Sequence, residues 1–248
     1  MTFTPYPHII SDFEIGAIKA RGFLFEGSSI PAAEFINTRF PNFDLLAVLE
    51  AINVTLSPAT GATIYKKVIL EEGLPPGIEI QFFSDDYADE NNGLALVRTF
   101  TWEDKNLVVK HEFFRLPRRV RRTGISKKIL LPLMQQYVNM GVRKILVHAA
   151  LEDGGFVWAK QFFLATKVSE VNSILAHAKG NLTPQQYMMA KRIYDNYYVH
   201  NAVGQAFPMY KWAELSFMEP ILRSSTWHGA VDLTNPIELG NFTTHAFG

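Results

Sequence analysis

Three short runs of β-branched and aromatic residues follow one another closely along the chain and constrain its fold more than any other feature. They are IEIQFFS (78–84), LALVRTFTW (94–102) and LVVKHEFFRL (107–116). The segments between them, DDYADENNG and EDKN, are rich in residues that favour turns. We therefore predict an antiparallel meander of three strands. The acidic first connection is expected to be a solvated turn, because it lacks the ligand spacing of a calcium loop.

The pattern then changes from strand to helix and back. After Gly124, apolar residues recur at helical spacing up to Met140, which predicts a helix there. VRKILVHAAL (142–151) has the continuous apolar character of a buried or parallel strand, and a further helix is expected after the EDGG segment. Three strands, a helix, a strand and a helix predict an α/β or α+β domain with a mixed sheet.

The flanks are less regular. DLLAVLEAI (44–52) predicts a short helix, ATIYKKVIL (62–70) fits a strand or a helix, and the prolines and glycines of EEGLPPGI (71–78) predict a loop. Beyond residue 170 the pattern is mainly helical, and Thr183 with Pro184 marks a helix start. The tail from residue 225 is turn-rich and aromatic. We expect a core with an N-terminal extension over 1–170, and a mainly helical C-terminal extension packed on it over 171–248.

Composition excludes several kinds of chemistry. The absence of cysteine rules out disulfides, thiolate nucleophiles and cysteine-bound metals. The 24 basic and 24 acidic residues cancel, so no overall field favours nucleic acid or an anionic membrane. No segment is apolar enough to span a bilayer, and the N-terminus lacks the pattern of a signal peptide, so we expect a cytoplasmic protein. No metal is predicted, because the histidines considered lack ligand spacing: His177, His200, His228 and His245.

Positive charge is nevertheless concentrated in FRLPRRVRRTGISKKILLPL (114–133). A strand, a basic loop with glycine and then a helix make the geometry of an anion site, because amides and the helix dipole at a helix start favour phosphate. One interpretation is that this loop binds a pyrophosphate group. A solvated basic loop and a contact to nucleic acid are the alternatives. The spacing matches neither the ATP P-loop nor the dinucleotide fingerprint.

The loop reads Arg121-x-x-Gly124-x-Ser126, which resembles the Arg/Gln-x-x-Gly-x-Gly/Ala signature of the GNAT superfamily of acyl-CoA-dependent N-acyltransferases. The order of elements from about 78 to 166 is similar to that of the family, and GGFVWAKQFF (154–163) is similar to its fourth helix. The resemblance implies a GNAT-like, mostly antiparallel mixed sheet flanked by helices. It also implies acyl-CoA as the co-substrate.

In the family this loop holds the pyrophosphate of coenzyme A, and the end of the preceding strand pairs with the pantetheine amides. The cofactor-binding residues so implied are Phe114, Arg115, Leu116, Arg118, Arg119, Arg121, Arg122, Thr123, Gly124, Ile125, Ser126 and Trp158. Three residues depart from the family pattern. Ser126 replaces a smaller residue, and Pro132 should kink the helix or delay its start. Trp158 stands where many members carry a tyrosine that protonates the leaving thiolate, which an indole cannot do.

Acyl transfer to an amine needs a base, and it needs a donor for the oxyanion. His111 and Glu112 are adjacent on the strand 107–116, and the period of two places them on opposite faces, so one of them can face a substrate. His111 is slightly preferred because its ordinary pKa lies nearer neutrality, whereas glutamate is the commoner base in the family. A purely structural role is the alternative for both.

Three further polar residues lie in or next to the predicted strand 142–151. His148 is expected to be a core residue of that strand. Glu152 and Asp153 could bind the acceptor amine, or could simply supply negative charge at the start of the next helix.

The predicted function is transfer of an acetyl or longer fatty acyl group from acyl-CoA to a primary amine of a small molecule or peptide side chain. The aromatic content of 13% suits a long acyl tunnel as well as an ordinary core. The alternative is a catalytically degenerate GNAT-like domain that binds an acyl ligand or a partner protein, and Trp158 favours it.

Overall fold

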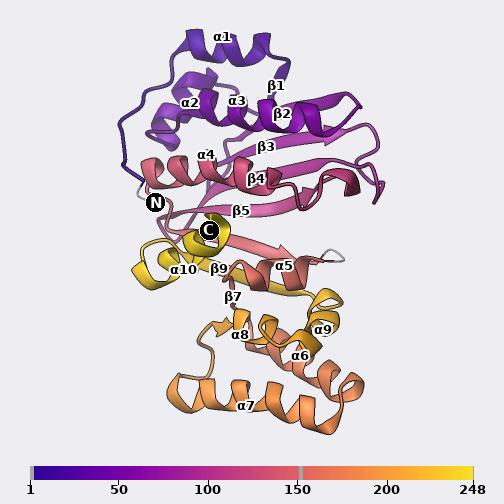
Figure 1. Cartoon of the computed structure of the whole chain (residues 1–248). Helices are drawn as coiled ribbons and strands as arrows, with labels where there is room; N and C mark the ends of the chain where they lie inside the picture. The colour runs from indigo at the N-terminus through magenta and orange to yellow at the C-terminus, as the bar shows by residue number, and fades with distance from the viewer. Residues whose placement is uncertain (1–2, 151–152, 248) are drawn as a thin grey trace. The chain divides into compact units, whose positions relative to one another are not determined.

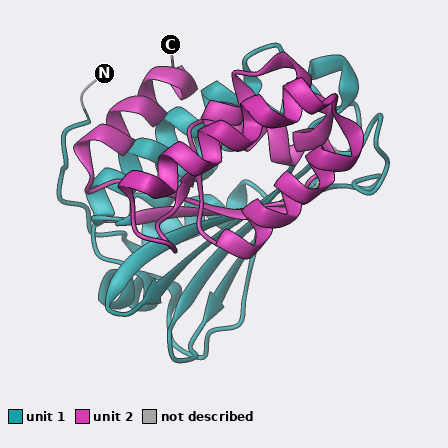
Figure 2. Ribbon diagram, turned by 90° about the horizontal axis from the view of Figure 1, so that it is seen from below, with its two compact units in different colours: residues 1–143 teal, residues 144–248 magenta. Residues whose placement is uncertain are grey.

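The computed structural model describes residues 3–150 and 153–247, and the chain divides into two compact units, residues 1–143 and 144–248 (Figures 1 and 2). Each unit combines strands with helices and has buried apolar residues of its own. This confirms the predicted α/β class. The division follows Arg143, whereas the sequence placed a boundary at residue 170; that domain assignment stays a prediction.

Unit 1 contains a five-stranded stretch of sheet in the order β1-β2-β3-β4-β5. β1 is parallel to β2, and the later neighbours are antiparallel. The predicted meander is confirmed as β3, β4 and β5, and the ambiguous segment 62–70 forms most of β2. The bounds are β1 Phe23–Glu26, β2 Ile64–Glu71, β3 Gly77–Ser84, β4 Ala95–Glu103 and β5 Asn106–Arg115.

Helices cover one face of this sheet, and α3 and α4 lie side by side over it (Figure 1). The face beneath them is apolar, and the ring of Phe43 lies 4.8 Å from that of Phe100 in β4. The predicted helices at 44–52 and 125–140 are confirmed as α3 and α4. The bounds are α1 Asp12–Ala20, α2 Ala32–Arg39, α3 Leu45–Leu56, η1 Ser57–Ala59, η2 Arg118–Val120 and α4 Ile125–Met140.

Two buried side-chain amides of α4 bind the N-terminal segment and the start of α3. Asn139 Oδ1 accepts a hydrogen bond from the amide of Tyr6 at 3.3 Å, and Gln136 Oε1 accepts one from the amide of Asp44 at 3.1 Å. Both α4 side chains are buried, so these bonds also satisfy groups that would be costly to leave unpaired. Pro132 lies inside α4, so the helix does not begin after it.

Unit 2 contains antiparallel strands in the order β6-β9-β7-β8. The helix start at Thr183 and Pro184 is confirmed, since Thr183 forms a capping box with Gln186. The strands are β6 Lys144–Ala149, β7 Leu164–Ala165, β8 Phe207–Pro208 and β9 Trp227–Asp232. The helices are α5 Gly154–Lys160, α6 Val168–Asn181, α7 Pro184–His200, α8 Tyr210–Ala213, η3 Ser216–Met218, α9 Glu219–Arg223 and α10 Pro236–Phe247.

The tail from residue 225 is more regular than its composition indicates. It provides β9, which pairs with β6 on one side and with β7 on the other, and it ends in α10. Along β9 buried and half-buried residues alternate. His228 and Gly229 interrupt the apolar pattern in the sequence, so the strand was not predicted. Throughout the ranges 3–150 and 153–247, no helix has the length and apolar character needed to cross a bilayer.

Candidate functional site

The predicted anion loop connects β5 to α4 and is folded by its own backbone. The turn η2 is closed by hydrogen bonds from Val120 N to Pro117 O at 3.0 Å and from Arg121 N to Arg118 O at 3.2 Å. Arg122 and Gly124 then adopt positive φ values of 65° and 80°. These left-handed residues turn the chain into the helix, and glycine is the residue that does this without steric cost.

Gly124 is the N-cap of α4, and its carbonyl accepts the first helical bond, from Lys128 N at 3.1 Å. A glycine has no side chain with which to cap the amides of the first turn. A Cβ built at this position would meet no atom within 4 Å, so the space in front of the helix start is open. An open helix start within a basic loop can accept an anion.

Arg115 and Arg121 of the loop are hydrogen-bonded to main-chain carbonyl groups. Arg121 donates from Nε to Leu116 O and from Nη2 to Glu90 O, both at 2.9 Å. Arg115 donates to Ala88 O at 2.8 Å. The bonds to Glu90 and Ala88 fasten the loop to the connection between β3 and β4, and the bond to Leu116 closes the loop on itself. Arg115 and Arg121 therefore hold the loop in shape, in addition to supplying positive charge.

The other loop residues are more accessible. Arg118, Arg119 and Arg122 are exposed, although Arg118 lies 3.9 Å from the carboxylate of Glu90 and Arg119 donates to Ala59 O at 3.3 Å. Thr123 is exposed and its hydroxyl donates to Val120 O at 2.7 Å. Ser126 is exposed and Ile125 is half-buried.

The predicted pantetheine segment is the end of β5. Phe114 and Arg115 pair with Leu96 and Ala95 of β4, and Leu116 is buried directly after the strand. The guanidinium of Arg98 lies 5.5 Å above the ring of Phe114. One edge of this segment is therefore already paired with protein.

His111 and Glu112 lie at a bulge in β5. Val97 pairs with Phe113 and Thr99 pairs with Lys110, so Arg98 faces two residues on β5 where a regular ladder has one. The period-two rule behind the predicted opposite faces therefore does not apply across this pair. Burial still separates them, because His111 is 3% exposed and Glu112 is an exposed residue.

The surroundings of His111 disfavour a positive charge. Its Nε2 is hydrogen-bonded to the buried hydroxyl of Tyr137 at 2.8 Å. Burial, reinforced by the charge of Arg98, holds the pKa of His111 well below its ordinary value. The pKa of Arg98 is itself lowered to about 10, chiefly by burial. His111 is consequently neutral at pH 7 and enclosed in the core of unit 1.

Arg98 was missed by the sequence analysis. It is 3% exposed and donates to the carbonyls of Val97 at 2.8 Å and Phe113 at 3.0 Å. The available signal was a single arginine in the centre of an apolar strand, since charged residues are rarely fully buried.

The remaining predicted residues lie in unit 2. Trp158 is half-buried on α5, and its ring packs edge-on against Phe163 with a centroid distance of 5.1 Å. Asp153 precedes α5 and is ion-paired with Arg223. Glu152 lies outside the described residues.

The expectation that His148 is a core residue is wrong, because its side chain is exposed on β6. The register of β6 and β9 places it opposite His228, and the two rings stack with centroids 4.3 Å apart. His228 Nδ1 is in turn bonded to Glu170 at 2.7 Å. Only the pairing of distant strands assembles this group, so a pattern search along the sequence could not find it.

Comparison with known proteins gives no further assignment: no protein-family model matches the chain, and no curated protein matches it. The function must therefore be inferred from the chemistry of the site.

Proposed function

We propose that this chain is an N-acyltransferase of the GNAT type, which transfers an acyl group from acyl-CoA to a primary amine of a small molecule or peptide side chain. The observation that carries the proposal is the turn from β5 through a basic loop into α4, with left-handed Gly124 as an open N-cap. Helix-start amides and nearby guanidinium groups are suited to a pyrophosphate.

The loop residues divide into two roles. The exposed side chains of Arg118, Arg119 and Arg122 supply charge and hydrogen-bond donors to the phosphate oxygens. Arg115 and Arg121, which are bonded to main-chain carbonyls, keep the loop in the required shape. A loop held in place before the ligand arrives loses less conformational entropy on binding.

Glu112 is the base in this proposal. It is exposed at the bulge of β5, whereas His111 is buried and hydrogen-bonded to Tyr137. Bulges often reorient a side chain beside an active site, which fits this role. The burial of His111 thus favours Glu112 over the residue slightly preferred from sequence.

The reaction balances with these groups. The neutral amine attacks the thioester carbonyl carbon, an N–C bond forms, and Glu112 takes the amine proton directly or through water. The tetrahedral intermediate then collapses, the C–S bond breaks, and the thiolate of coenzyme A leaves. Water protonates the thiolate, because the indole of Trp158 is a donor too weak to serve as an acid.

Thermal unfolding with graded donors tests the proposal. Free CoA, acetyl-CoA and acyl-CoAs up to palmitoyl-CoA are each added to the purified chain. A ligand at 100 times its Kd raises the free energy of unfolding by about 2.7 kcal/mol, which is readily detected. Stabilisation that grows with acyl length indicates a fatty-acyl donor, and equal stabilisation indicates acetyl transfer.

Gly124→Glu is the decisive variant, because its carboxylate occupies the open helix start and repels phosphate. Gly141→Glu is the matched control. Gly141 lies at the other end of α4, also has a positive φ, and also has no atom within 4 Å of a built Cβ. We expect Gly124→Glu to lose stabilisation by CoA and Gly141→Glu to keep it. Equal responses of the two variants would refute the loop assignment.

The second candidate is a degenerate domain that binds an acyl ligand or a partner protein without turnover. Trp158 at the expected acid position favours it. Stabilisation by acyl-CoA without release of free thiol, across a panel of amine acceptors, would support this candidate instead.

A further inference from the structure

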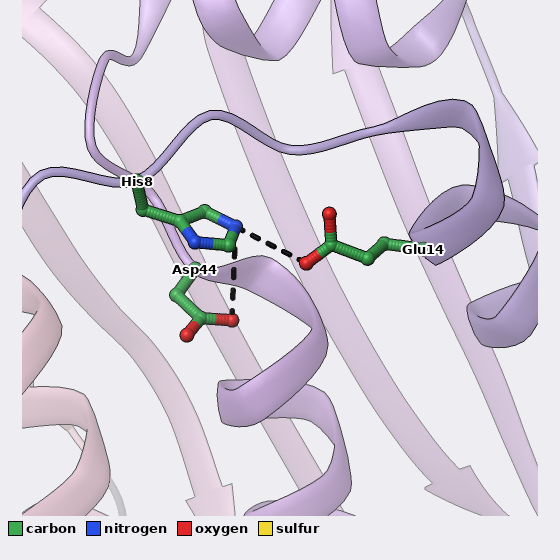
Figure 3. Close-up of side chains that lie close together, drawn as sticks. All are labelled: His8, Glu14 and Asp44. Carbon is green, nitrogen blue, oxygen red and sulfur yellow. Dashed lines mark ion pairs between the residues drawn. The ribbon is translucent and has the colours of Figure 1, made fainter.

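Three metal-ligating side chains from separate segments of unit 1 converge on one point (Figure 3). Nε2 of His8 lies 3.3 Å from Oε1 of Glu14 and 4.0 Å from Oδ1 of Asp44. The three ligand atoms all lie within 4.8 Å of one another. His8 precedes α1, Glu14 lies in the first turn of α1, and Asp44 is the N-cap of α3.

The backbone on both sides of His8 is fixed by asparagine side chains. The amide of His8 donates to Asn42 Oδ1 at 3.3 Å. The amide of Ile10 donates to Asn37 Oδ1 at 3.0 Å, and Asn37 Nδ2 donates back to Ile10 O at 2.9 Å. The main chain that carries the imidazole is therefore held by bonds that do not involve its ring.

The two carboxylates are oriented by bonds of their own. Glu14 Oε2 accepts from the amide and hydroxyl of Ser11 at 2.8 and 2.7 Å, which leaves Oε1 directed at His8. Asp44 Oδ2 accepts from the hydroxyl of Tyr6 at 3.1 Å, and Oδ1 caps the amide of Ala47 at 3.0 Å. Such outer bonds fix the orientation of ligands at metal sites.

The His8 ring nitrogen is enclosed. Among the described residues, Nε2 is buried from solvent and makes no hydrogen bond, although two carboxylate oxygens lie nearby. A protonated imidazole paired with a carboxylate directs its N–H at one oxygen. Here neither carboxylate oxygen forms a hydrogen bond with Nε2, although the three atoms lie within 4.8 Å of one another.

We propose that His8, Glu14 and Asp44 bind a divalent metal ion of the zinc type. Tetrahedral zinc with bonds of about 2.0–2.1 Å separates its ligands by about 3.3 Å. The His8–Glu14 pair already has this separation, and the 4.0 Å between His8 and Asp44 must shorten when the ion binds. One imidazole with two carboxylates suits zinc better than magnesium or calcium, which prefer all-oxygen sites. The two carboxylates supply the negative charge that neutralises the ion, whereas the dipoles of the two helix starts oppose a cation.

Isothermal titration of EDTA-treated protein with zinc chloride tests this site, with magnesium and calcium chloride for comparison. We expect one strong zinc site per chain and a rise of the unfolding midpoint with zinc. Glu14→Gln keeps the capping box and Asp44→Asn keeps the N-cap, so both variants should fold. Each, like His8→Gln, should weaken zinc binding at least about 100-fold, since even outer-shell changes cost 10–100-fold.

Glu34→Gln is the matched control, because Glu34 is an exposed acid in the first turn of α2. It should bind zinc as the unaltered chain does. Cobalt absorption provides a second readout: tetrahedral cobalt bands are expected in the unaltered chain and not in His8→Gln. The absence of a strong zinc site, or equal zinc affinity in Glu14→Gln and Glu34→Gln, would overturn the proposal and leave an ion pair. This test does not depend on acyl-CoA binding.

Discussion

At the scale of single residues, the neighbours of a side chain decide its chemistry. His111 and Glu112 are adjacent in sequence, but His111 lies in the core with its Nε2 2.8 Å from the Tyr137 hydroxyl, whereas Glu112 is exposed. A buried imidazole with a depressed pKa is a weak base and cannot reach the amine of the proposed reaction. The exposed carboxylate has neither restriction.

Glu112→Gln should therefore lower the rate of acyl transfer by about 100-fold or more, the usual contribution of a general base. Stabilisation by CoA should be unchanged, because the donor loop is intact. Glu103→Gln is the control, since Glu103 is an exposed acid of the same sheet, paired with Lys110 at 3.1 Å. The measurement is release of free thiol with an amine panel. Equal rates in the two variants would show that the base lies elsewhere.

At the scale of elements, α4 combines well-defined ends with a proline in its interior, which destabilises a helix. It begins and ends at left-handed glycines, which define both ends clearly, yet Pro132 lies in its interior. Proline cannot donate to the carbonyl four residues earlier, which here belongs to Lys128, and its ring crowds that carbonyl. The helix persists because residues such as Leu133 and Tyr137 are buried against the rest of unit 1.

Pro132→Ala should raise the free energy of unfolding by about 1–3 kcal/mol, because alanine restores the missing donor. Pro184→Ala is the control, since Pro184 is at the first position of α7, where proline is favourable. That variant should show no gain. Denaturant unfolding monitored by circular dichroism measures both. If Pro132→Ala does not raise the free energy of unfolding, Lys128 O already has another hydrogen-bond donor.

At the scale of the whole molecule, charge is balanced overall and uneven locally. The 24 basic and 24 acidic residues cancel, and the isoelectric point is about 7.1. Five arginines and two lysines nevertheless lie between Arg115 and Lys128. Attraction of an anionic ligand to this segment should weaken as salt is added.

The balanced charge predicts a solubility minimum close to the isoelectric point of 7.1. Molecules without net charge lack the mutual repulsion that opposes association. Light scattering across a pH series should show the most association near neutrality and less on either side. A monotonic trend through this range would contradict the expectation.

Much of the backbone was predictable from sequence. The strands β3, β4 and β5, the helix α4 and the capped start of α7 all follow from local signals: period-two patterning, helical spacing, glycine and a Thr-Pro start. The position of the basic loop between a strand and a helix was predictable from the same local signals. In β9 the signal was too weak, because His228 and Gly229 interrupt the apolar pattern.

The sequence by itself determined the strands β3 to β5, the helix α4, the start of α7 and which loop is basic, because backbone periodicity and capping depend on residues a few positions apart. Tertiary structure alone decided that His111 is buried, that His148 is exposed against His228, and that His8, Glu14 and Asp44 meet. Each of these depends on strand register, on a bulge or on segments tens of residues apart. Packing of the folded chain sets those relations, and local sequence does not encode them.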